Sequence, residues 1–241
     1  MDIELKQVMV PQNPVREDAF QLSDTDKIRN IEYHFREIMQ ILGLDLSDDS
    51  IKDTPHRVAK MYVKEIFSGL NPNNKPAVTL FKNKYKYGQM LIEKDITLFS
   101  NCEHHFVPIY GKAHLAYVPG DKVIGLSKLN RIVQHFAKRP QVQERLTMQI
   151  GRELQSFLGT KDVAVVVEAR HMCVAARGIQ DAGSATITSF YDGAFLNADT
   201  KNERVNFGDV DSQTSQNYYE VFFGLLWQFG VCFDNFYPQV A

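Results

Sequence analysis

Hydrophobic residues recur at three- and four-residue steps in four segments of the chain, the period of an amphipathic helix. The first segment covers residues 23–43, with Ser23 or Thr25 as a possible N-cap and Gly43 as the stop. The second covers 53–69, where Pro55 suits the first helical turn behind Asp53 or Thr54. Two more follow between residues 129 and 159, separated by Pro140. The apolar stripes expected to be buried are Ile28, Ile31, Phe35, Ile38 and Leu42; Val58, Met61, Tyr62, Ile66 and Phe67; Leu129, Ile132, Val133 and Phe136; and Val142, Leu146, Ile150, Leu154 and Leu158.

Between these helices the period moves toward two, which is typical of β-strands. We expect strands at 95–100 and 105–120, the latter folding into a hairpin at 110–112. A β-branched run over 162–178 predicts another strand, with 184–191 as its antiparallel neighbour. The order of elements indicates an α+β domain in which helices cover one face of an antiparallel sheet.

The chain divides into four parts. Residues 1–22 lack periodicity and contain two prolines, which predicts a mobile arm that folds over a partner subunit. Residues 23–70 form an N-terminal helical segment, and 71–204 form the main domain. Residues 205–241 are an acidic, aromatic-rich C-terminal extension. With 241 residues, the chain is long enough to bury a core without disulfides.

Charge is distributed unevenly. The formal net charge is −2, which argues against a strongly basic nucleic-acid binder. No Lys or Arg follows Arg204, so residues 1–204 carry 27 basic against 25 acidic side chains and are mildly cationic. This leaves room for an anionic substrate.

Cysteine usage and hydropathy favour a cytoplasmic location. The chain has three cysteines, a small and odd number that argues against a disulfide framework. In a reducing compartment such thiols are free to bind metal. No signal peptide is visible at the N-terminus. The longest apolar stretch, 218–233, is interrupted by Glu220 and Gln228 and is shorter than the ~20 residues of a membrane helix. We expect no membrane partner.

The segment NCEHHFVP, residues 101–108, contains the strongest chemical signal. Cys102 and His105 are spaced so that both can reach one ion from a single turn. Alone, this pair is more typical of a buried cysteine beside two surface histidines. A second pair, His171 and Cys173, at the end of a β-branched strand, changes the balance because two distant segments then supply metal-ligand groups.

Two thiolates and one imidazole suit zinc and leave a fourth tetrahedral position for water, as in catalytic zinc sites. The predicted ligands are Cys102, His105 and Cys173. In an extended backbone the adjacent His104 points to the opposite side, which leaves it free for proton transfer. Zinc activates water near neutral pH, and His104 or His171 can supply protons. The segment therefore predicts a hydrolytic site.

Three blocks carry a family resemblance. SNCEHHFVPIYGKAHLAYVPGDKVIGLSKLNRIVQHFAKRPQVQERLTMQI, EARHMCVAARG and DTPHRVAKMYVKEIFSGL resemble GTP cyclohydrolase I, a zinc enzyme of pteridine biosynthesis. The resemblance covers roughly residues 24–200 in the right order. It implies conversion of GTP and water to 7,8-dihydroneopterin triphosphate and formate, the first step toward tetrahydrofolate and other pterins.

The resemblance also implies roles for individual residues. It places one zinc ion per subunit on the same three ligands, Cys102, His105 and Cys173. In the family, activated water attacks C8 of guanine, the imidazole ring opens, and a second hydration releases the formyl carbon as formate. His104 matches the histidine that protonates N7, and His171 matches a second proton shuttle.

Further matches concern substrate binding. Ser127 lies where the family has a hydroxyl near the sugar, and Glu144 matches the carboxylate that accepts hydrogen bonds from guanine, with Gln143 beside it. A carboxylate facing two donors rejects adenine, which lacks that pair. Without the resemblance, Glu144 is typical of an exposed helix acid. The triphosphate ligands implied are Lys128, Arg131, Arg177 and, from a neighbouring subunit, Arg57.

The family adopts the tunnelling fold over 71–204, in which subunit sheets join edge to edge and two pentameric rings stack into a homodecamer with sites between subunits. Edge pairing would also protect exposed strands. Ala175 departs from the family, where a longer side chain is common. The extension 205–241 is not part of the family pattern, and three interpretations stay open: a helix packed on the body, a partner or membrane-surface contact, or a passage without function. Cys232 within it is most simply a buried thiol.

Two alternatives belong to other classes. One is a non-catalytic relative, a zinc-stabilised scaffold or pterin-binding protein, although His104, His171 and Glu144 are all present. The other is a related-fold enzyme such as a pyruvoyl-tetrahydropterin synthase, which binds zinc through three histidines, or a nitrile reductase acting on a deazaguanine, which uses a nucleophilic cysteine. The sequence leaves open the downstream pathway and any feedback regulator.

Overall fold

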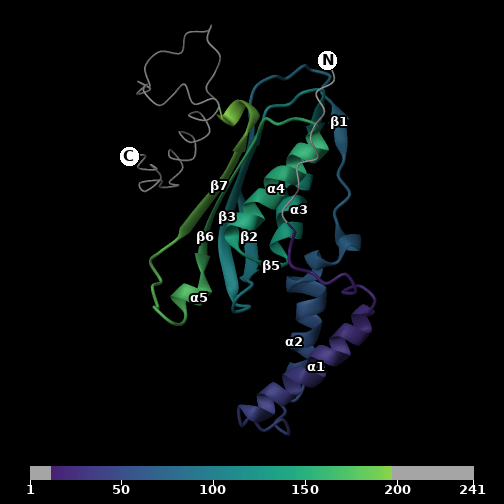
Figure 1. Ribbon diagram of the computed structural model, residues 1–241, viewed down its shortest axis with the longest axis vertical. Coiled ribbons are helices and arrows are strands. Elements are labelled where there is room, and N and C mark those ends of the chain that lie inside the picture. The colour runs from purple at the N-terminus through teal and green to yellow at the C-terminus, as the bar shows by residue number, and fades with distance from the viewer. Residues whose placement is uncertain (1–11, 197–241) are drawn as a thin grey trace.

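The computed structural model describes residues 12–196, which build a sheet with helices on one face (Figure 1). The main strands are β2 (Leu91–Cys102), β3 (Pro108–Tyr117), β5 (Pro140–Gln141), β6 (Val163–His171) and β7 (Thr186–Asp192). Their order is β5-β2-β3-β6-β7, and all pairs are antiparallel except the short pairing of β5 with β2. A separate two-stranded sheet is formed by β1 (Leu80–Lys82) and β4 (Lys122–Ile124).

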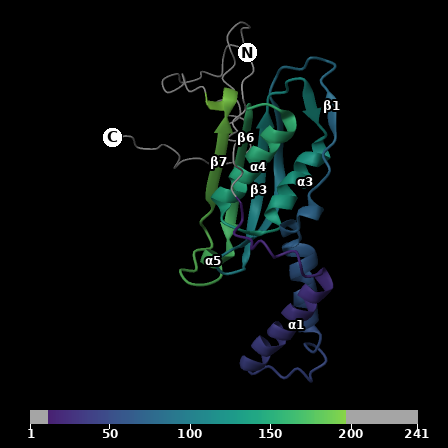
Figure 2. The same ribbon diagram turned by 45° about the vertical axis from the view of Figure 1, so that its right-hand side comes forward.

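Helices α3 (Leu126–Ala137) and α4 (Gln143–Leu158) cover one face of the main sheet. Helix α3 packs on β2, and α4 packs on β6 and β7, so both lie on the same side in the turned view (Figure 2). This confirms the predicted α+β class. The predicted stripes form the core between the layers: Leu129, Ile132, Val133, Phe136, Leu146, Ile150, Leu154 and Leu158 are all buried.

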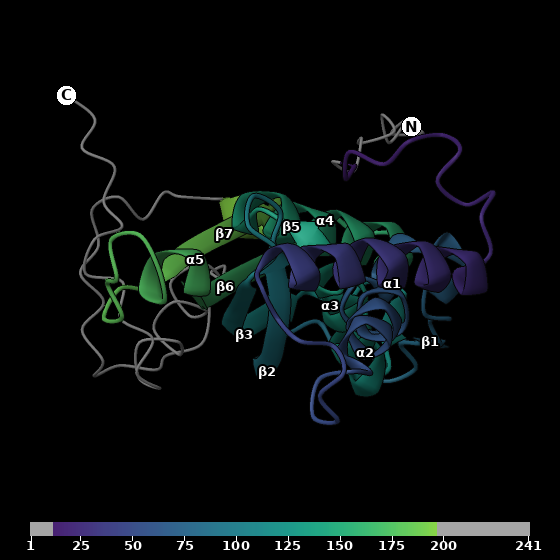
Figure 3. The same cartoon turned by 90° about the horizontal axis from the view of Figure 1, so that it is seen from below.

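Helices α1 (Asp24–Ile41) and α2 (Thr54–Met61) pack side by side below the sheet (Figure 3). Ser23 is the N-cap of α1, since its hydroxyl accepts a hydrogen bond from the Asp26 N–H at 3.1 Å, as predicted. The predicted buried stripe is wrong in its second half. Ile38 is 49% exposed and Leu42 72% exposed, whereas Met39 is buried. Because α1 packs on α2 and the turn after it rather than on the sheet, only a narrow face of α1 is covered.

The second predicted helix, 53–69, is interrupted. Regular α-helix ends at Met61, a π-helical turn covers Tyr62–Ile66, and a 3-10 turn covers Ser68–Leu70. Asp53 occupies the N-cap position but its side chain makes no capping hydrogen bond. The Gly69 N–H donates to the Lys138 carbonyl at 2.9 Å, which ties this turn to the end of α3.

The predicted hairpin at 110–112 is wrong. Strand β3 runs straight through Gly111, and the turn between β2 and β3 lies at 103–107 instead. Glycine is needed at 111 for another reason: a Cβ there would lie 2.0 Å from the Glu168 carbonyl oxygen on β6. A glycine that permits close strand approach has the same one-letter signature as a turn glycine.

The remaining strand predictions are confirmed with adjusted ends. The strand expected at 95–100 extends over the whole of β2 and contains a β-bulge between Glu93 and Ile96. The run expected at 162–178 divides into β6 and the short helix α5 (Met172–Ala175). Strand β7 pairs antiparallel with β6, as predicted for 184–191.

The predicted N-terminal arm is described from residue 12 on. Residues 12–22 contain neither helix nor strand, yet Asn13 is buried and its amide donates to the Pro140 carbonyl at 2.8 Å. Residues 1–11 and 197–241, including the extension 205–241 with Cys232, lie outside the described residues. Among the helices within 12–196, none is both long and apolar enough to cross a membrane.

Candidate metal centre

The turn between β2 and β3 holds the first two predicted ligands. Cys102 is the last residue of β2 and is only 4% exposed. Two backbone hydrogen bonds of 2.8 Å, from the Cys102 N–H to the Val107 carbonyl and from the Phe106 N–H to the Cys102 carbonyl, close the turn. Phe106 has a positive φ of 54°, which reverses the chain tightly. The turn brings His105 Nδ1 to 3.9 Å from Cys102 Sγ.

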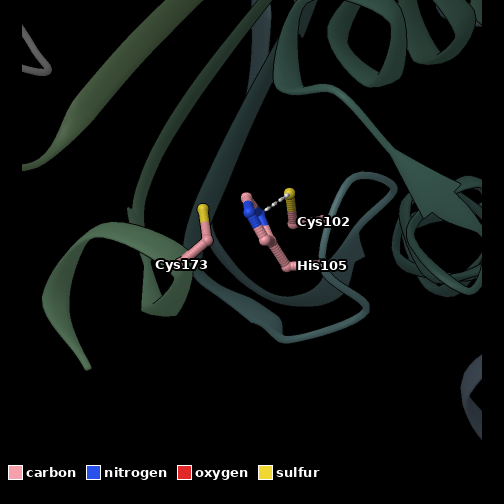
Figure 4. A group of neighbouring side chains, drawn as sticks. All are labelled: Cys102, His105 and Cys173. Atoms are coloured by element: carbon pink, nitrogen blue, oxygen red, sulfur yellow. Dashed lines mark hydrogen bonds between the residues drawn. The ribbon is translucent and has the colours of Figure 1, made fainter. Parts of the chain in front are cut away.

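The third predicted ligand lies on the short helix that follows the neighbouring strand. In the antiparallel pairing of β3 with β6, Ile109 is opposite His171, so the end of β6 lies beside the turn. Helix α5 begins immediately afterwards and carries Cys173. The ligand atoms of Cys102, His105 and Cys173 all lie within 4.8 Å of one another. Figure 4 shows the three side chains pointing toward a common centre, with the imidazole between the two sulfurs.

These three side chains fit a metal ion. A tetrahedral site with metal–sulfur bonds of about 2.3 Å and metal–nitrogen bonds of about 2.0 Å has ligand–ligand edges of roughly 3.5–3.8 Å. The spacing of up to 4.8 Å exceeds these edges by at most about 1.3 Å, which small side-chain rotations can close. Burial, followed by the neighbouring Cys102 thiol, raises the pKa of Cys173, so a metal ion would have to displace a proton from it.

His104 lies beside the centre without belonging to the ligand group. Its Nδ1 is 3.8 Å from Cys102 Sγ, and its ring meets the His105 ring edge-on at 6.4 Å between centroids. The prediction that the two histidines point apart assumed an extended backbone, and that assumption is wrong because residues 103–105 form a turn. His104 is exposed, as a proton donor to a substrate must be.

His171 is held by Gln143 from the first turn of α4. Gln143 is buried, and its amide group donates to the carbonyls of Val167 at 3.0 Å and Thr186 at 2.9 Å. Because both amide hydrogens are used, its oxygen accepts from His171 Nε2–H at 2.7 Å. The orientation leaves Nδ1 of His171 as the free nitrogen. Burial lowers the pKa of His171, and the nearby Glu144 carboxylate opposes this shift.

Two charged side chains flank the same end of the sheet. Glu144 is exposed in the first turn of α4, next to Gln143. Arg177 is also exposed, with its Nη1 3.0 Å from His105 Nε2 and 3.5 Å from the Cys173 carbonyl oxygen. The metal group, both histidines, Glu144 and Arg177 therefore gather at one place.

Ser127, Lys128 and Arg131 lie elsewhere. Helix α3 runs alongside β2: the Asn130 side chain reaches Glu93 at 3.3 Å, and the Gln134 side chain reaches the Thr97 carbonyl at 2.6 Å. The start of α3 is therefore level with the beginning of β2, roughly 30 Å from Cys102 at about 3.3 Å per strand residue. These three residues are too far away to join the metal group of the same chain.

Arg57 is the last of the predicted substrate ligands. It is exposed on α2 and pairs with Asp53 at 3.7 Å. A pair this exposed leaves the guanidinium accessible to other anions.

The ion pair that holds the turn was not predicted from the sequence. Glu103 entered only as part of the NCEHHFVP segment, and no role was predicted for Arg145. The two form an ion pair in the structure, with side chains 24% and 14% exposed. Sequence spacing gave no signal for this contact, because it joins positions 42 residues apart.

The fold and site define a class: an α+β protein with a Cys–His–Cys group that could hold a metal ion, beside two further histidines. The family model for GTP cyclohydrolase I matches residues 31–208. The chain therefore belongs to the GTP cyclohydrolase I family. Residues 209–241 lie beyond the matched range.

Curated relatives agree with this assignment. A GTP cyclohydrolase 1 of Flavobacterium johnsoniae is 58% identical over 201 residues, covering 83% of this chain and 90% of the relative. One of Citrobacter koseri is 56% identical over 196 residues, covering 81% and 87%. One of Aeromonas salmonicida is 59% identical over 174 residues, covering 72% and 80%.

Proposed function

We propose that this chain hydrolyses GTP as a zinc-dependent GTP cyclohydrolase I, giving formate and 7,8-dihydroneopterin triphosphate. The observation that carries the proposal is the meeting of Cys102, His105 and Cys173 within 4.8 Å, from segments about seventy positions apart, in a chain of this family. Zinc is the proposed ion, one per subunit, because two thiolates and an imidazole match its ligand preference. When bound, zinc supplies Lewis-acid activation of water near neutral pH.

The two histidines would move the protons of the reaction. The exposed ring of His104 lies beside the metal ligands, where it can protonate N7 of a bound guanine. His171 has its Nε2–H committed to Gln143, so Nδ1 is the atom that exchanges protons with the substrate. Gln143, predicted as a substrate ligand, has both amide hydrogens committed to backbone carbonyls, which supports a role in holding His171.

Glu144 would select the base. Its carboxylate is exposed at the start of α4, close enough to influence His171, and can accept hydrogen bonds from N1–H and the exocyclic amine of guanine. Adenine has no matching donor pair, so it would leave the carboxylate without partners. Arg177, beside His105, can meet a negatively charged part of the substrate.

The remaining predicted ligands favour a site shared between subunits. Ser127, Lys128 and Arg131 lie at the far end of α3, and together with Arg57 they would reach the metal centre of a neighbouring copy. Strands β7 and β2 offer pairing edges: within the described residues, β7 pairs only with β6, and β5 covers only the last two residues of the outer edge of β2. Edge-to-edge joining would produce the rings of the tunnelling fold, with two pentamers stacked as a decamer.

A cytoplasmic location fits this chemistry. Cys102 and Cys173 are free thiols, and a reducing compartment keeps them available as ligands. The product would feed tetrahydrofolate or other pterin synthesis.

The direct test is incubation of the purified, zinc-loaded protein with GTP. We expect formate release and neopterin fluorescence after oxidation and dephosphorylation, and no formate from ATP. His104→Ala should abolish pteridine formation while zinc content stays at one per subunit. Zinc binding without any turnover of GTP would instead support a non-catalytic pterin-binding relative. Full activity of His104→Ala would remove the proton-transfer role of that residue.

A further inference from the structure

The first turn of α4 places three consecutive residues at the site. Gln143 holds His171 on β6, Glu144 faces solvent beside it, and Arg145 contacts Glu103 in the metal-binding turn. Successive helical residues point about 100° apart, so neighbours in sequence reach different elements. One helical turn therefore carries both the proposed guanine ligand, Glu144, and a contact to the metal-binding turn.

Arg145 is the anchor on the metal side. Besides Glu103, its Nε donates to the Gln141 side-chain oxygen at 3.1 Å, and its Nη2 donates to the Pro140 carbonyl at 3.2 Å. The Glu103 N–H also donates to the Gln141 carbonyl at 3.0 Å. Glu103 is thus bound through its backbone to the segment before α4 and through its carboxylate to the first turn of α4.

Gln141 is itself fixed from the other side. Its amide group donates to the Phe136 carbonyl at 2.8 Å and to the Gln149 side-chain oxygen at 2.8 Å. The buried Asn13 donates to Gln141 Oε1 at 3.3 Å. Arg145 therefore connects the exposed metal-binding turn to a buried hydrogen-bond network, which restrains the turn.

We propose that Arg145 is a positioning residue for the metal centre, acting through Glu103. Glu103 lies between Cys102 and His105, so holding its carboxylate holds the backbone that carries both ligands. The same contact helps to set the separation between the metal-binding turn and Glu144, the residue before Arg145 in the helix. The effect on turnover rests on the proposed function, whereas the effect on metal affinity does not.

Guanidinium chemistry explains why arginine is suited to this position. A planar fork can serve several acceptors at once in fixed directions, and Arg145 serves three: Glu103, Gln141 and Pro140. A lysine carries the same charge on a single nitrogen and would satisfy fewer of them. Removing Arg145 would leave the Glu103 carboxylate, 24% exposed, without its partner and free to turn toward water.

The chain offers a matched control on the same helix. Arg152 pairs with Asp192 at 2.9 Å, with both side chains 23% exposed, about two turns beyond Arg145. It also donates to Gln155, so it too serves more than one acceptor. Arg152→Met removes a comparable ion pair from α4 without contacting the metal-binding turn.

The test compares Arg145→Met, Arg145→Lys, Glu103→Gln and Arg152→Met in the full chain. Zinc affinity is measured by competition with a chromogenic chelator, and kcat and KM are measured with GTP at saturating zinc. We expect Arg145→Met to weaken zinc binding by about 10-fold or more, the range for groups that orient metal ligands. Its kcat should fall more than its KM rises. Arg145→Lys should lie between Arg145→Met and the unmodified protein, and Arg152→Met should match the unmodified protein in zinc affinity.

Glu103→Gln keeps the shape and backbone N–H of the turn, so it tests the contact even if Arg145→Met folds poorly. The double variant Arg145→Met with Glu103→Gln should bind zinc no more weakly than the weaker single variant, because both act through one contact. Unchanged zinc affinity in Glu103→Gln and Arg145→Lys, or an equal loss in Arg152→Met, would overturn the proposal. If the unmodified protein releases no formate while the zinc pattern holds, the proposed function fails and the positioning role stands.

Discussion

Burial lowers the pKa of two histidines outside the metal centre, His114 and His135. His114 on β3 is 1% exposed, and burial lowers its pKa to about 4, with Lys112 and Lys94 adding to the shift and Asp95 opposing it. Its Nδ1 accepts a hydrogen bond from the Asp95 N–H at 3.2 Å. His114 is therefore neutral in the folded protein near pH 7.

His135 on α3 behaves in the same way. It is 7% exposed, and burial, followed by the positive charges of Arg139 and Lys75, lowers its pKa to about 4. Its Nε2 accepts from Arg139 at 2.7 Å, which requires an unprotonated nitrogen. Both histidines thus resist protonation until the pH is well below their unfolded value of about 6.5.

The consequence is a loss of stability in acid. Below pH 6.5 the unfolded chain binds protons at these positions and the folded chain does not, so stability falls as the pH drops toward 4 and levels off below it. Each histidine contributes about 3 kcal/mol over that range. Urea unfolding of the zinc-loaded protein at pH 5 and 6 should show this loss. In His114→Gln the slope of the unfolding free energy against pH should decrease near pH 5 by about 1.4 kcal/mol per pH unit, which corresponds to about one proton. An unchanged slope would mean that His114 is protonated in the folded state.

Strand β3 requires a glycine at position 111 to pair closely with β6. A Cβ on Gly111 would lie 2.0 Å from the Glu168 carbonyl oxygen and 2.6 Å from Ala169 Cα, both backbone atoms of β6. Backbone atoms in the middle of a sheet have little room to move. The closeness of β3 and β6 matters for the site, because their pairing brings the end of β6 and Cys173 beside the metal-binding turn.

We therefore expect Gly111→Ala to destabilise the fold by about 3 kcal/mol or more, at the upper end of overpacking costs. The same variant should lower zinc affinity, because it separates the strands that carry the ligands. Gly120→Ala is the matched control, since nothing lies within 4 Å of a Cβ there. Thermal unfolding and zinc titration of the two variants provide the measurement. Equal stability of both variants would show that β6 moves aside freely.

For the whole molecule, one group of exposed apolar side chains lies on and just after α1. Tyr33, Ile38, Ile41 and Leu42 on and just after α1 are between 49% and 83% exposed. A single chain gains nothing from this surface, whereas a patch of this kind is typical of a protein interface. Together with the pairing edges of β2 and β7, it supports assembly with further copies of the chain.

Placing a charge in that surface should weaken the assembly. Ile41 is 83% exposed, so Ile41→Glu leaves the folding of one chain nearly unchanged. If the position is buried between copies, the change costs about 2 kcal/mol or more per subunit. Sedimentation velocity should then show smaller species than for the unmodified protein. Gln40→Glu adds the same charge one residue earlier on an exposed polar position and should leave the mass unchanged. If Ile41→Glu and Gln40→Glu both keep the mass of the unmodified assembly, α1 lies outside the interface.

Helices and ligand identities could be predicted because both depend on local order along the chain. The stripes of α3 and α4 recur with the helical period, and burial against the sheet follows directly from that pattern. The motif residues Cys102, His105 and Cys173 are recognisable by type, because few side chains bind soft metal ions. Where α1 packs on α2 and the turn after it, the same reasoning assigned the wrong buried face, because periodicity does not say which neighbour is present.

Local order along the chain thus predicted the α+β class, the approximate extent of α3 and α4, and the residue types of the candidate metal group. The folded molecule alone placed the hairpin at 103–107, joined Arg145 to Glu103, and separated Ser127 from Cys102 by the length of a strand. The physical reason is that periodicity and residue type are properties of neighbouring positions. Strand register, close backbone approach and hydrogen bonds between distant positions exist only once the sheet has assembled.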